Sequence, residues 1–417
     1  MGQWGAWRGP VGTGFSERAT PPMTWSPREH VQWRLPLSGQ GHSSPVVWDG
    51  VIFVTTAVPH GETLPRRVPE RIGAHHNLEP SSRLRFEVWA ISLDDGSVRW
   101  KRTLRDEQPH EGVHETGSWA SASCTTDGEV LVVPFGSVGL FVLSLDGESL
   151  WDTDLGDMST KHGHGEGSSP LLVGDLVITQ WDHEEGSFLV ALDKKTGAER
   201  WRVARQEVTS WASPIAVEVD GVVQVITAAT GRVRGQNAKT GAAIWEAGGL
   251  SNNVVASPVA GNGRLFVGSS YEIRSMFAVS LQGAKGDISN SERVLWKRAR
   301  DTPYVPSPIL EDGRLCFLRH LSAMMTCVDP ATGVAQFGPK KLPGLRRVFS
   351  SPVGAPGRTY VTSQEGTTVV LGPGPGFELL ATNHLKEGAT ASPALVGDVF
   401  IMRTEGALYA LREKGAP

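Results

Sequence analysis

The chain has 417 residues, of which 39% are hydrophobic, and it contains 49 glycines, 27 prolines and 14 tryptophans, a composition typical of a turn-rich all-β protein. Its 40 basic and 44 acidic residues give a net charge of −4 without blocks of one sign, which argues against nucleic acid or an anionic membrane as a partner. No apolar stretch reaches about 18 residues, so we expect no membrane span. The start lacks the regions of a signal peptide. We therefore expect a cytoplasmic protein, or a periplasmic or secreted one whose signal peptide was removed.

A unit repeats along the chain. Each copy begins with Ser-Pro or a stand-in, continues through two apolar segments and a turn rich in Asp and Gly, and closes on an aromatic residue. From Cys124 onward, successive copies begin 41 to 50 residues apart, which indicates a repeat array. The first step is 79 residues because it contains an insertion near 58–85. The copies begin at Pro45, Cys124, Pro170, Pro214, Pro258, Pro308, Pro352 and Pro393.

Each copy predicts four short antiparallel strands, here called A to D in chain order. Residues 167–205 illustrate the pattern, with four apolar segments separated by turns that contain Gly and Asp. A lone sheet of this kind would leave its apolar faces in water, so neighbouring sheets must stack, and radial stacking forms a propeller. Strand A is the inner edge, where a proline at the beginning removes no sheet hydrogen bond.

The two ends of the chain predict how the ring closes. The last copy, from Pro393, lacks a D strand, whereas residues 31–35, which include Trp33, form a D strand without a sheet. Pairing these pieces removes the open end of the array. We therefore expect one eight-bladed propeller at 30–417, a lead-in at 1–29 that runs over the outside, and a monomer.

Aromatic residues recur at the beginning of the D strands, where flat side chains can pack between adjacent blades. We interpret them as packing residues rather than as binding residues. They are Trp100, Trp151, Trp201, Trp245, Trp296 and Phe337.

The three cysteines leave two alternatives open. Cys316 and Cys327 lie on consecutive predicted strands, and symmetric pairing about their turn would allow a cross-strand disulfide. Two buried thiols are the preferred interpretation, because a shift of one residue in register removes the pairing.

The run from Ala191 to Trp201, Ala-Leu-Asp-Lys-Lys-Thr-Gly-Ala-Glu-Arg-Trp, recurs in weaker form at 237–245 and 328–337. It resembles the repeats of the pyrroloquinoline-quinone (PQQ) enzyme family of eight-bladed propellers. This quinoprotein alcohol dehydrogenase-like superfamily includes BamB-like assembly lipoproteins, and the opening at 7–14 and the segment 42–45 look like uncharacterised bacterial members. The resemblance implies either a binding scaffold or an enzyme that holds a quinone with calcium, an aspartate base and often a disulfide between adjacent cysteines. Because the chain has no adjacent cysteines, we do not expect PQQ.

Loop lengths indicate which rim binds a ligand. In an A-B-C-D meander the BC and DA connections share one rim, and these are the long ones, including the insertion and residues 103–119. The DA connections lead into the innermost strands, so their last residues should converge at the mouth of the channel.

Histidines are concentrated in these connections. His162 and His164 should point to the same side of an extended segment, and imidazole with carboxylate suits zinc, copper or iron. The candidate ligands of a divalent metal are His42, His114, His162, His164 and Glu166. Ordinary hydrogen-bonded loop histidines are the alternative, and His75 and His76 are expected to lie in a poorly ordered loop.

Other residues of the same rim suggest ligand contacts. Trp119 and Trp211 could form an aromatic floor or pack at the channel rim, and Arg346 and Arg347 could bind a carboxylate or phosphate. Asn252, Asn253 and Tyr304 complete the candidates, with Tyr304, His162, His164 and Glu166 as possible acid-base groups.

Two classes of function follow. The first is a non-catalytic scaffold that binds a protein or carbohydrate partner at the long-loop rim, because no recognisable nucleophile or acid-base motif is present. The second is a metal- or PQQ-dependent enzyme, an oxidoreductase or lyase, with its site in the central funnel. The fold alone does not decide between them.

Overall fold

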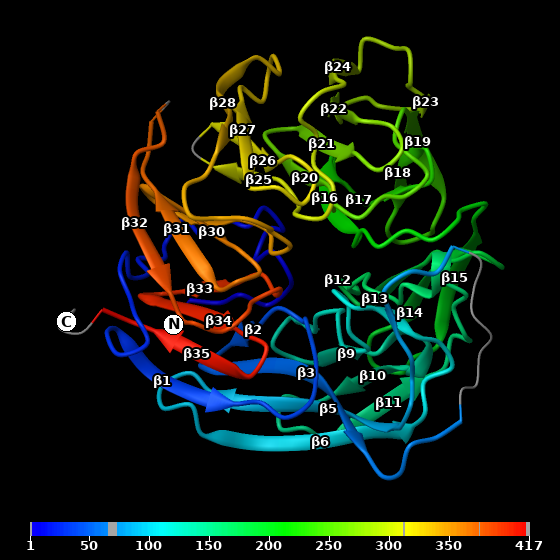
Figure 1. Cartoon of the computed structure of the whole chain (residues 1–417). Helices are drawn as coiled ribbons and strands as arrows, with labels where there is room; N and C mark the ends of the chain where they lie inside the picture. Colours follow the sequence, from blue (N-terminus) through cyan, green and yellow to red (C-terminus); the bar gives the residue numbers. More distant parts are fainter. Residues whose placement is uncertain (1, 66–72, 312, 375, 414–417) are drawn as a thin grey trace.

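The computed structural model describes residues 2–65, 73–311, 313–374 and 376–413, and residues 66–72 of the predicted insertion lie outside these ranges. The described residues form eight sheets of at least four antiparallel strands, which are arranged radially about a central channel (Figure 1). The predicted all-β, eight-bladed propeller is therefore confirmed. No helix among the described residues has the length and apolarity needed to cross a membrane.

The first four blades come in chain order, and the first strand of each blade is its innermost strand. Their strands are β2 (Val46–Trp48), β3 (Val51–His60), β5 (Arg83–Ser92) and β6 (Val98–Glu107); β8 (Thr125–Thr126), β9 (Leu131–Pro134), β10 (Leu140–Leu143) and β11 (Ser149–Thr153); β12 (Leu171–Val173), β13 (Leu176–Trp181), β14 (Phe188–Asp193) and β15 (Glu199–Ala204); and β16 (Ile215–Val219), β17 (Val222–Ala229), β18 (Arg232–Asn237) and β19 (Ala243–Gly248), with β23 (Gly286–Asp287) added in parallel at the outer edge.

The remaining blades repeat the order. Their strands are β20 (Val259–Gly261), β21 (Arg264–Ser269), β22 (Ser275–Ser280) and β24 (Val294–Arg298); β25 (Ile309–Glu311), β26 (Arg314–Leu318), β27 (Met324–Val328) and β28 (Ala335–Lys341); β29 (Val353–Ala355), β30 (Arg358–Thr362), β31 (Thr367–Leu371) and β32 (Leu379–His384); and β33 (Ala394–Val396), β34 (Val399–Arg403) and β35 (Ala407–Leu411) with β1 (Val31–Pro36). Outside the blades lie β4 (Asn77–Leu78), β7 (Val113–His114) and the single 3-10 turns η1 (Gly136–Val138) and η2 (Lys161–Gly163).

The first and last parts of the chain share one blade. Strand β1 pairs with β35 in antiparallel register, with Arg34 opposite Tyr409 and Leu35 opposite Leu408. Figure 1 shows this pairing as a blue strand beside red ones. The predicted closure is confirmed, and the strand that the last repeat lacks comes from the N-terminus.

A closed ring of serine hydrogen bonds joins the blades at the inner edge. The backbone N–H of Ser44 donates to Oγ of Ser123 at 2.9 Å, and the same bond continues from each blade to the next. Successive serines are Ser169, Ser213, Ser257, Ser307, Ser351 and Ser392, at 2.8–3.0 Å. The N–H of Ser392 returns to Oγ of Ser44 at 3.1 Å and closes the circle.

This ring explains why serine precedes the repeated proline. A following proline restricts the preceding residue to extended backbone conformations, which hold the serine N–H and Oγ in the required directions. All eight serines are buried, so their N–H groups depend on these bonds. The edge position of strand A explains the repeated proline, and the hydrogen-bond ring, which was not predicted from the sequence, explains the serine.

Five D-strand tryptophans pack against the next blade as predicted, whereas the indole of Trp245 donates to Gln224 of its own blade at 2.8 Å. The indole N–H of Trp151 donates to the carbonyl of Lys194, at 2.8 Å, in the CD turn of the next blade. Gly197 of that turn has φ 72°, and a Cβ there would lie 2.7 Å from the ring of Trp151. The same contact joins four more pairs of blades through Trp33, Trp100, Trp201 and Trp296.

The N-terminal segment differs from the expectation that it runs over the outside. It crosses the inner strands and closes the channel at the end opposite the BC and DA loops. Trp4 exchanges backbone hydrogen bonds with Val47 of β2, both at 2.9 Å. The buried guanidinium of Arg8 donates to the carbonyls of Pro308 and Pro352 on the far side of the ring. The channel is therefore a cup with one open mouth.

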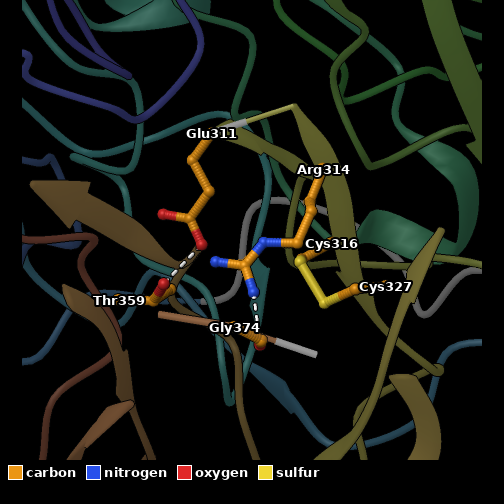
Figure 2. The surroundings of a disulfide bond; sticks show 6 residues. All are labelled: Glu311, Arg314, Cys316, Cys327, Thr359 and Gly374. Atoms are coloured by element: carbon orange, nitrogen blue, oxygen red, sulfur yellow. Dashed lines mark hydrogen bonds between the residues drawn. A yellow bond between two sulfur atoms is a disulfide. The ribbon is translucent and has the colours of Figure 1, made fainter. Parts of the chain in front are cut away.

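Blade six contains a disulfide bond between Cys316 and Cys327 (Figure 2). The two residues are directly opposite in the register of β26 and β27, as symmetric pairing predicted. The preferred alternative of two thiols is therefore not what the structure contains. Nearby, Arg314 donates to the carbonyl of Gly374 at 2.7 Å and Thr359 donates to Glu311, which join blades six and seven.

Ser257→Ala tests the serine ring. The substitution leaves the buried N–H of Ser213 without an acceptor, so we expect the free energy of unfolding to fall by about 1–3 kcal/mol. Urea denaturation followed by tryptophan fluorescence measures it. Ser149→Ala, at an exposed serine of β11, is the matched control and should change stability little. Equal stability of the two variants would contradict a structural role for the ring.

The disulfide predicts the number of reactive thiols. Protein purified without reductant and unfolded in guanidinium should react with one equivalent of a thiol reagent, at Cys124, because Cys316 and Cys327 are joined. After reduction, the same assay should find three. Three thiols before reduction would show that the bond is absent.

Candidate functional site

The open mouth of the cup holds a cavity of about 460 Å³. Each blade contributes to its wall through the residues that lead into strand A, among them His42, Trp211, Asn253, Tyr304 and Thr390. The BC loops add further residues, including His75 and Tyr271. The DA connections therefore converge at the mouth of the channel, as the sequence predicted.

Three histidines of this wall form a candidate metal centre. One ring nitrogen from each of His75, His114 and His164 lies within 4.8 Å of the other two. The rings of His75 and His164 meet edge to face at 4.7 Å between centroids, and those of His114 and His164 at 4.9 Å. Ligand nitrogens of a tetrahedral zinc ion are roughly 3.3 Å apart, so small rotations of the rings would complete the site.

Backbone pairing brings the three histidines together from distant parts of the chain. Strand β4, in the insertion of blade one, pairs with β7, which places Asn77 opposite His114. The N–H of His114 donates to the carbonyl of His164 at 3.2 Å. The Asn77 amide donates to the carbonyls of His162 and Gly163, at 2.8 and 2.9 Å. The insertion is therefore tied to both DA connections that supply the other ligands.

Hydrogen bonds leave one ring nitrogen of His75 and one of His164 available to a metal. Nδ1 of His75 lies 2.9 Å from the carbonyl of Gly73, so its proton has an acceptor and Nε2 is left for a metal. Nδ1 of His114 accepts the backbone N–H of Thr116 at 3.2 Å and lies 2.8 Å from Thr116 Oγ1, so the proton of the neutral ring is on Nε2, and metal binding through Nε2 would move it to Nδ1. Nε2 of His164 is buried and has no hydrogen-bond partner among the described residues.

Burial favours the neutral form of these imidazoles. Burial first, and then the nearby charges of His114 and His75, lower the pKa of His164 to about 4. Burial, and then the charge of His75, also lower the pKa of His114. At neutral pH both imidazoles are therefore uncharged, and the uncharged ring is the form that binds metal ions.

Of the predicted metal ligands, His114 and His164 are in this triad. His162 lies beside it, with its ring 5.4 Å from that of His164, but the segment is not extended as expected. His162 has φ 57° and lies in η2, next to Gly163 and Gly165 at φ 65° and 82°. These glycines allow the chain to turn tightly.

Glu166 and His42 are not in the triad. Both carboxylate oxygens of Glu166 accept from Ser137, whose backbone N–H donates at 2.8 Å and whose hydroxyl donates to the second oxygen. Burial raises the pKa of Glu166 to about 7. His42 lines the cavity elsewhere, where burial and then the charge of Arg403 lower its pKa to about 4.

The two tryptophans of the predicted aromatic floor, Trp119 and Trp211, border one smaller cavity together. The indole of Trp211 donates to the carbonyl of Gly165 at 2.7 Å and also borders the cavity at the open mouth. Trp119 donates to the carbonyl of Glu111 at 2.9 Å and borders the smaller cavity, which Trp211 also lines. Tyr304 instead stacks between Tyr271 and His320, with centroid distances of 5.8 and 4.7 Å.

Of the Asn and Arg residues predicted to contact a ligand, one lies in the funnel wall and the others are exposed. Asn253 is buried and accepts a hydrogen bond of 3.0 Å from Lys161 Nζ, whereas Asn252 is exposed. Arg346 and Arg347 are exposed, and the charge of Arg347 contributes to lowering the pKa of His114, after burial and the nearer groups.

His75 was not among the metal ligands predicted from the sequence, although the structure places it in the candidate metal centre. Its position could have been inferred, because the insertion was correctly placed on the same rim as the DA connections. No spacing between His75 and the other two histidines signals their meeting, since they belong to three separate connections.

The comparisons with known proteins agree on the fold. The family model described as outer membrane protein assembly factor BamB matches residues 27–178 and 84–337. A search of curated proteins finds no match. Among solved structures, BamB from Moraxella catarrhalis is 15% identical with a TM-score of 0.60, and the alignment covers 92% of this chain and 99% of that one.

Two dehydrogenases are similar at the same level. A europium-containing methanol dehydrogenase is 11% identical with a TM-score of 0.66, covering 97% of this chain and 90% of its own. The quinohemoprotein alcohol dehydrogenase ADHIIG from Pseudomonas putida HK5 is 12% identical with a TM-score of 0.62, covering 100% and 81%. These identities establish a shared fold and nothing further.

The funnel residues do not suit a quinone held with calcium. Calcium prefers six to eight oxygen ligands. Among the described residues that line the funnel, Glu166 is the one carboxylate, and Ser137 already binds both of its oxygens. The disulfide joins two strands of blade six rather than adjacent cysteines. The imidazole cluster suits zinc, copper, iron or nickel instead.

The length of the sequence match and the observed fold together assign the chain to a family. The matched segments extend from residue 27 to residue 337, well over half of the chain, and the eight blades agree with the repeat. The chain therefore belongs to the PQQ-repeat propeller family described as outer membrane protein assembly factor BamB.

Proposed function

We propose that the protein is a metal-dependent enzyme whose funnel binds a divalent transition metal, zinc in the first instance, through His75, His114 and His164. The observation that carries the proposal is His164 Nε2, a buried nitrogen without a partner among the described residues. An unpaired buried polar atom costs free energy unless a ligand binds it. The other two imidazoles converge on the same point.

The ligand set suggests a catalytic rather than a structural metal. Three protein ligands leave a fourth position for water or substrate, as in catalytic zinc sites. Here that position opens on a cavity of about 460 Å³, large enough for a small molecule. A metal in this position would polarise a substrate oxygen and activate water, so hydrolase or lyase chemistry fits the site.

A binding scaffold is the second candidate. The BC loop of blade five exposes Ile273 and Tyr271, which are 58% and 44% accessible, on the same rim. Exposed apolar and aromatic side chains on a rim suit docking of a protein or carbohydrate partner. Membership in the family described as outer membrane protein assembly factor BamB supports this role as well. A scaffold role does not explain the Nε2 of His164, which is unpaired among the described residues.

Metal content separates the two candidates. Protein incubated with zinc and then dialysed should retain about one zinc per chain by mass spectrometry, because three imidazoles bind it. His114→Ala and His164→Ala should each lose most of it. His384→Ala is the matched control, since this exposed histidine of β32 lies outside the funnel.

Circular dichroism should show that all the variants remain folded. Retention of zinc by both funnel variants, or no bound zinc in the unsubstituted protein, would contradict the metal proposal and favour the scaffold.

A further inference from the structure

Outside the histidine triad, the funnel wall is rich in hydrogen-bond donors and poor in free side-chain acceptors. Among the described residues that line it, the one carboxylate, Glu166, is already occupied by Ser137. The amide oxygen of Asn253 accepts from Lys161. A ligand that fits this wall must therefore supply the acceptors itself.

Lys161 places a positive charge in this wall. Its Nζ is held by Asn253 Oδ1 at 3.0 Å and lies 5.4 Å from the ring centre of Tyr271. Lys161 Nζ also forms an ion pair of 3.7 Å with Glu272, whose side chain is 42% exposed, so solvent screens this pair. Lys161 precedes His162 in η2, and its Nζ reaches the ring of Tyr271, which stacks on Tyr304.

A buried guanidinium adds to the positive potential. Arg403 donates to the carbonyls of Ser43 and Thr55 and to the hydroxyl of Ser43, and no ion pair joins it to a carboxylate among the described residues. It lies near His42 in the wall, where its charge contributes, after burial, to lowering the pKa of that ring. Charge in a surface of low dielectric attracts anions strongly.

The serine ring supplies neutral donors at the floor. Six of its members line the cavity: Ser44, Ser123, Ser169, Ser213, Ser351 and Ser392. Each Oγ accepts an N–H from the neighbouring blade, and none donates its proton to a described residue. These hydroxyl protons are available to oxygen atoms of a ligand.

From these groups we infer that the funnel binds a small, oxygen-rich carboxylic acid, such as a sugar acid. Its carboxylate pairs with Lys161 and its other oxygens accept from the serine hydroxyls. The inference rests on the proposed function only in placing the reacting part of this ligand at the histidine triad. A carboxylate fits better than a phosphate, because the charge inside the wall is a single ammonium rather than the guanidinium fork that binds phosphate in two places.

Calorimetric titration of the zinc-loaded protein tests the inference, with D-glucuronate, D-glucose and inorganic phosphate as the probes. We expect D-glucuronate to bind, D-glucose to bind at least about tenfold more weakly, and phosphate to compete less well than D-glucuronate. Lys161→Gln should weaken D-glucuronate binding by about tenfold or more, and Lys161→Arg should restore part of it.

Lys239→Gln is the matched control, because Lys239 is exposed in a CD turn on the opposite rim. Equal binding of glucose and glucuronate, an unchanged affinity in Lys161→Gln, or no glucuronate binding at millimolar concentration would overturn the inference. Stronger binding of phosphate would overturn the assignment of a carboxylate.

The same titration of metal-free protein separates this inference from the proposed function. Glucuronate binding that depends on Lys161 in a protein that retains no zinc would support the inference and refute the metal centre. Zinc retention without glucuronate binding would refute the inference alone.

Discussion

The closed circle of serine hydrogen bonds is the constraint on which the rest of the structure depends. Each blade gives one buried N–H to the hydroxyl of the next, so the beginnings of the eight inner strands are joined in one circle. The indole contacts between D strands and neighbouring CD turns repeat this alignment at the outer side of the blades. Because both sets of bonds join successive blades, they restrict the positions of the DA connections at the mouth of the cup.

The two ends of the cup are built differently. At one end, the N-terminal segment crosses the inner strands, and Arg8 binds carbonyls of blades six and seven directly after their ring serines. At the other end, the loops are long and carry imidazole, ammonium and phenol groups. A rigid ring with one closed end thus leaves a single mouth in which polar groups can face a ligand, an arrangement common to binding sites on rigid scaffolds.

The insertion of blade one changes what this mouth can do. Without it, the two DA connections supply His114 and His164, and two imidazoles are a weak metal site. The pairing of β4 with β7 and the amide of Asn77 bring the third imidazole, His75, against them. The candidate metal centre therefore depends on a segment that contributes nothing to the propeller itself, whereas the anion-binding groups belong to the repeat and its connections.

Sequence alone determined the number of blades, the closing strand and the rim that carries the long loops, because each follows from a local pattern that recurs along the chain. It allowed Cys316 to lie opposite Cys327 but favoured two thiols, whereas the structure contains a disulfide. Only the tertiary structure decided which side chains meet. Glu166 follows His164 by two residues yet turns to Ser137, and His75 joins histidines about 40 and 90 residues away. Such contacts depend on the packing of separate connections around the axis, which no spacing within one repeat encodes.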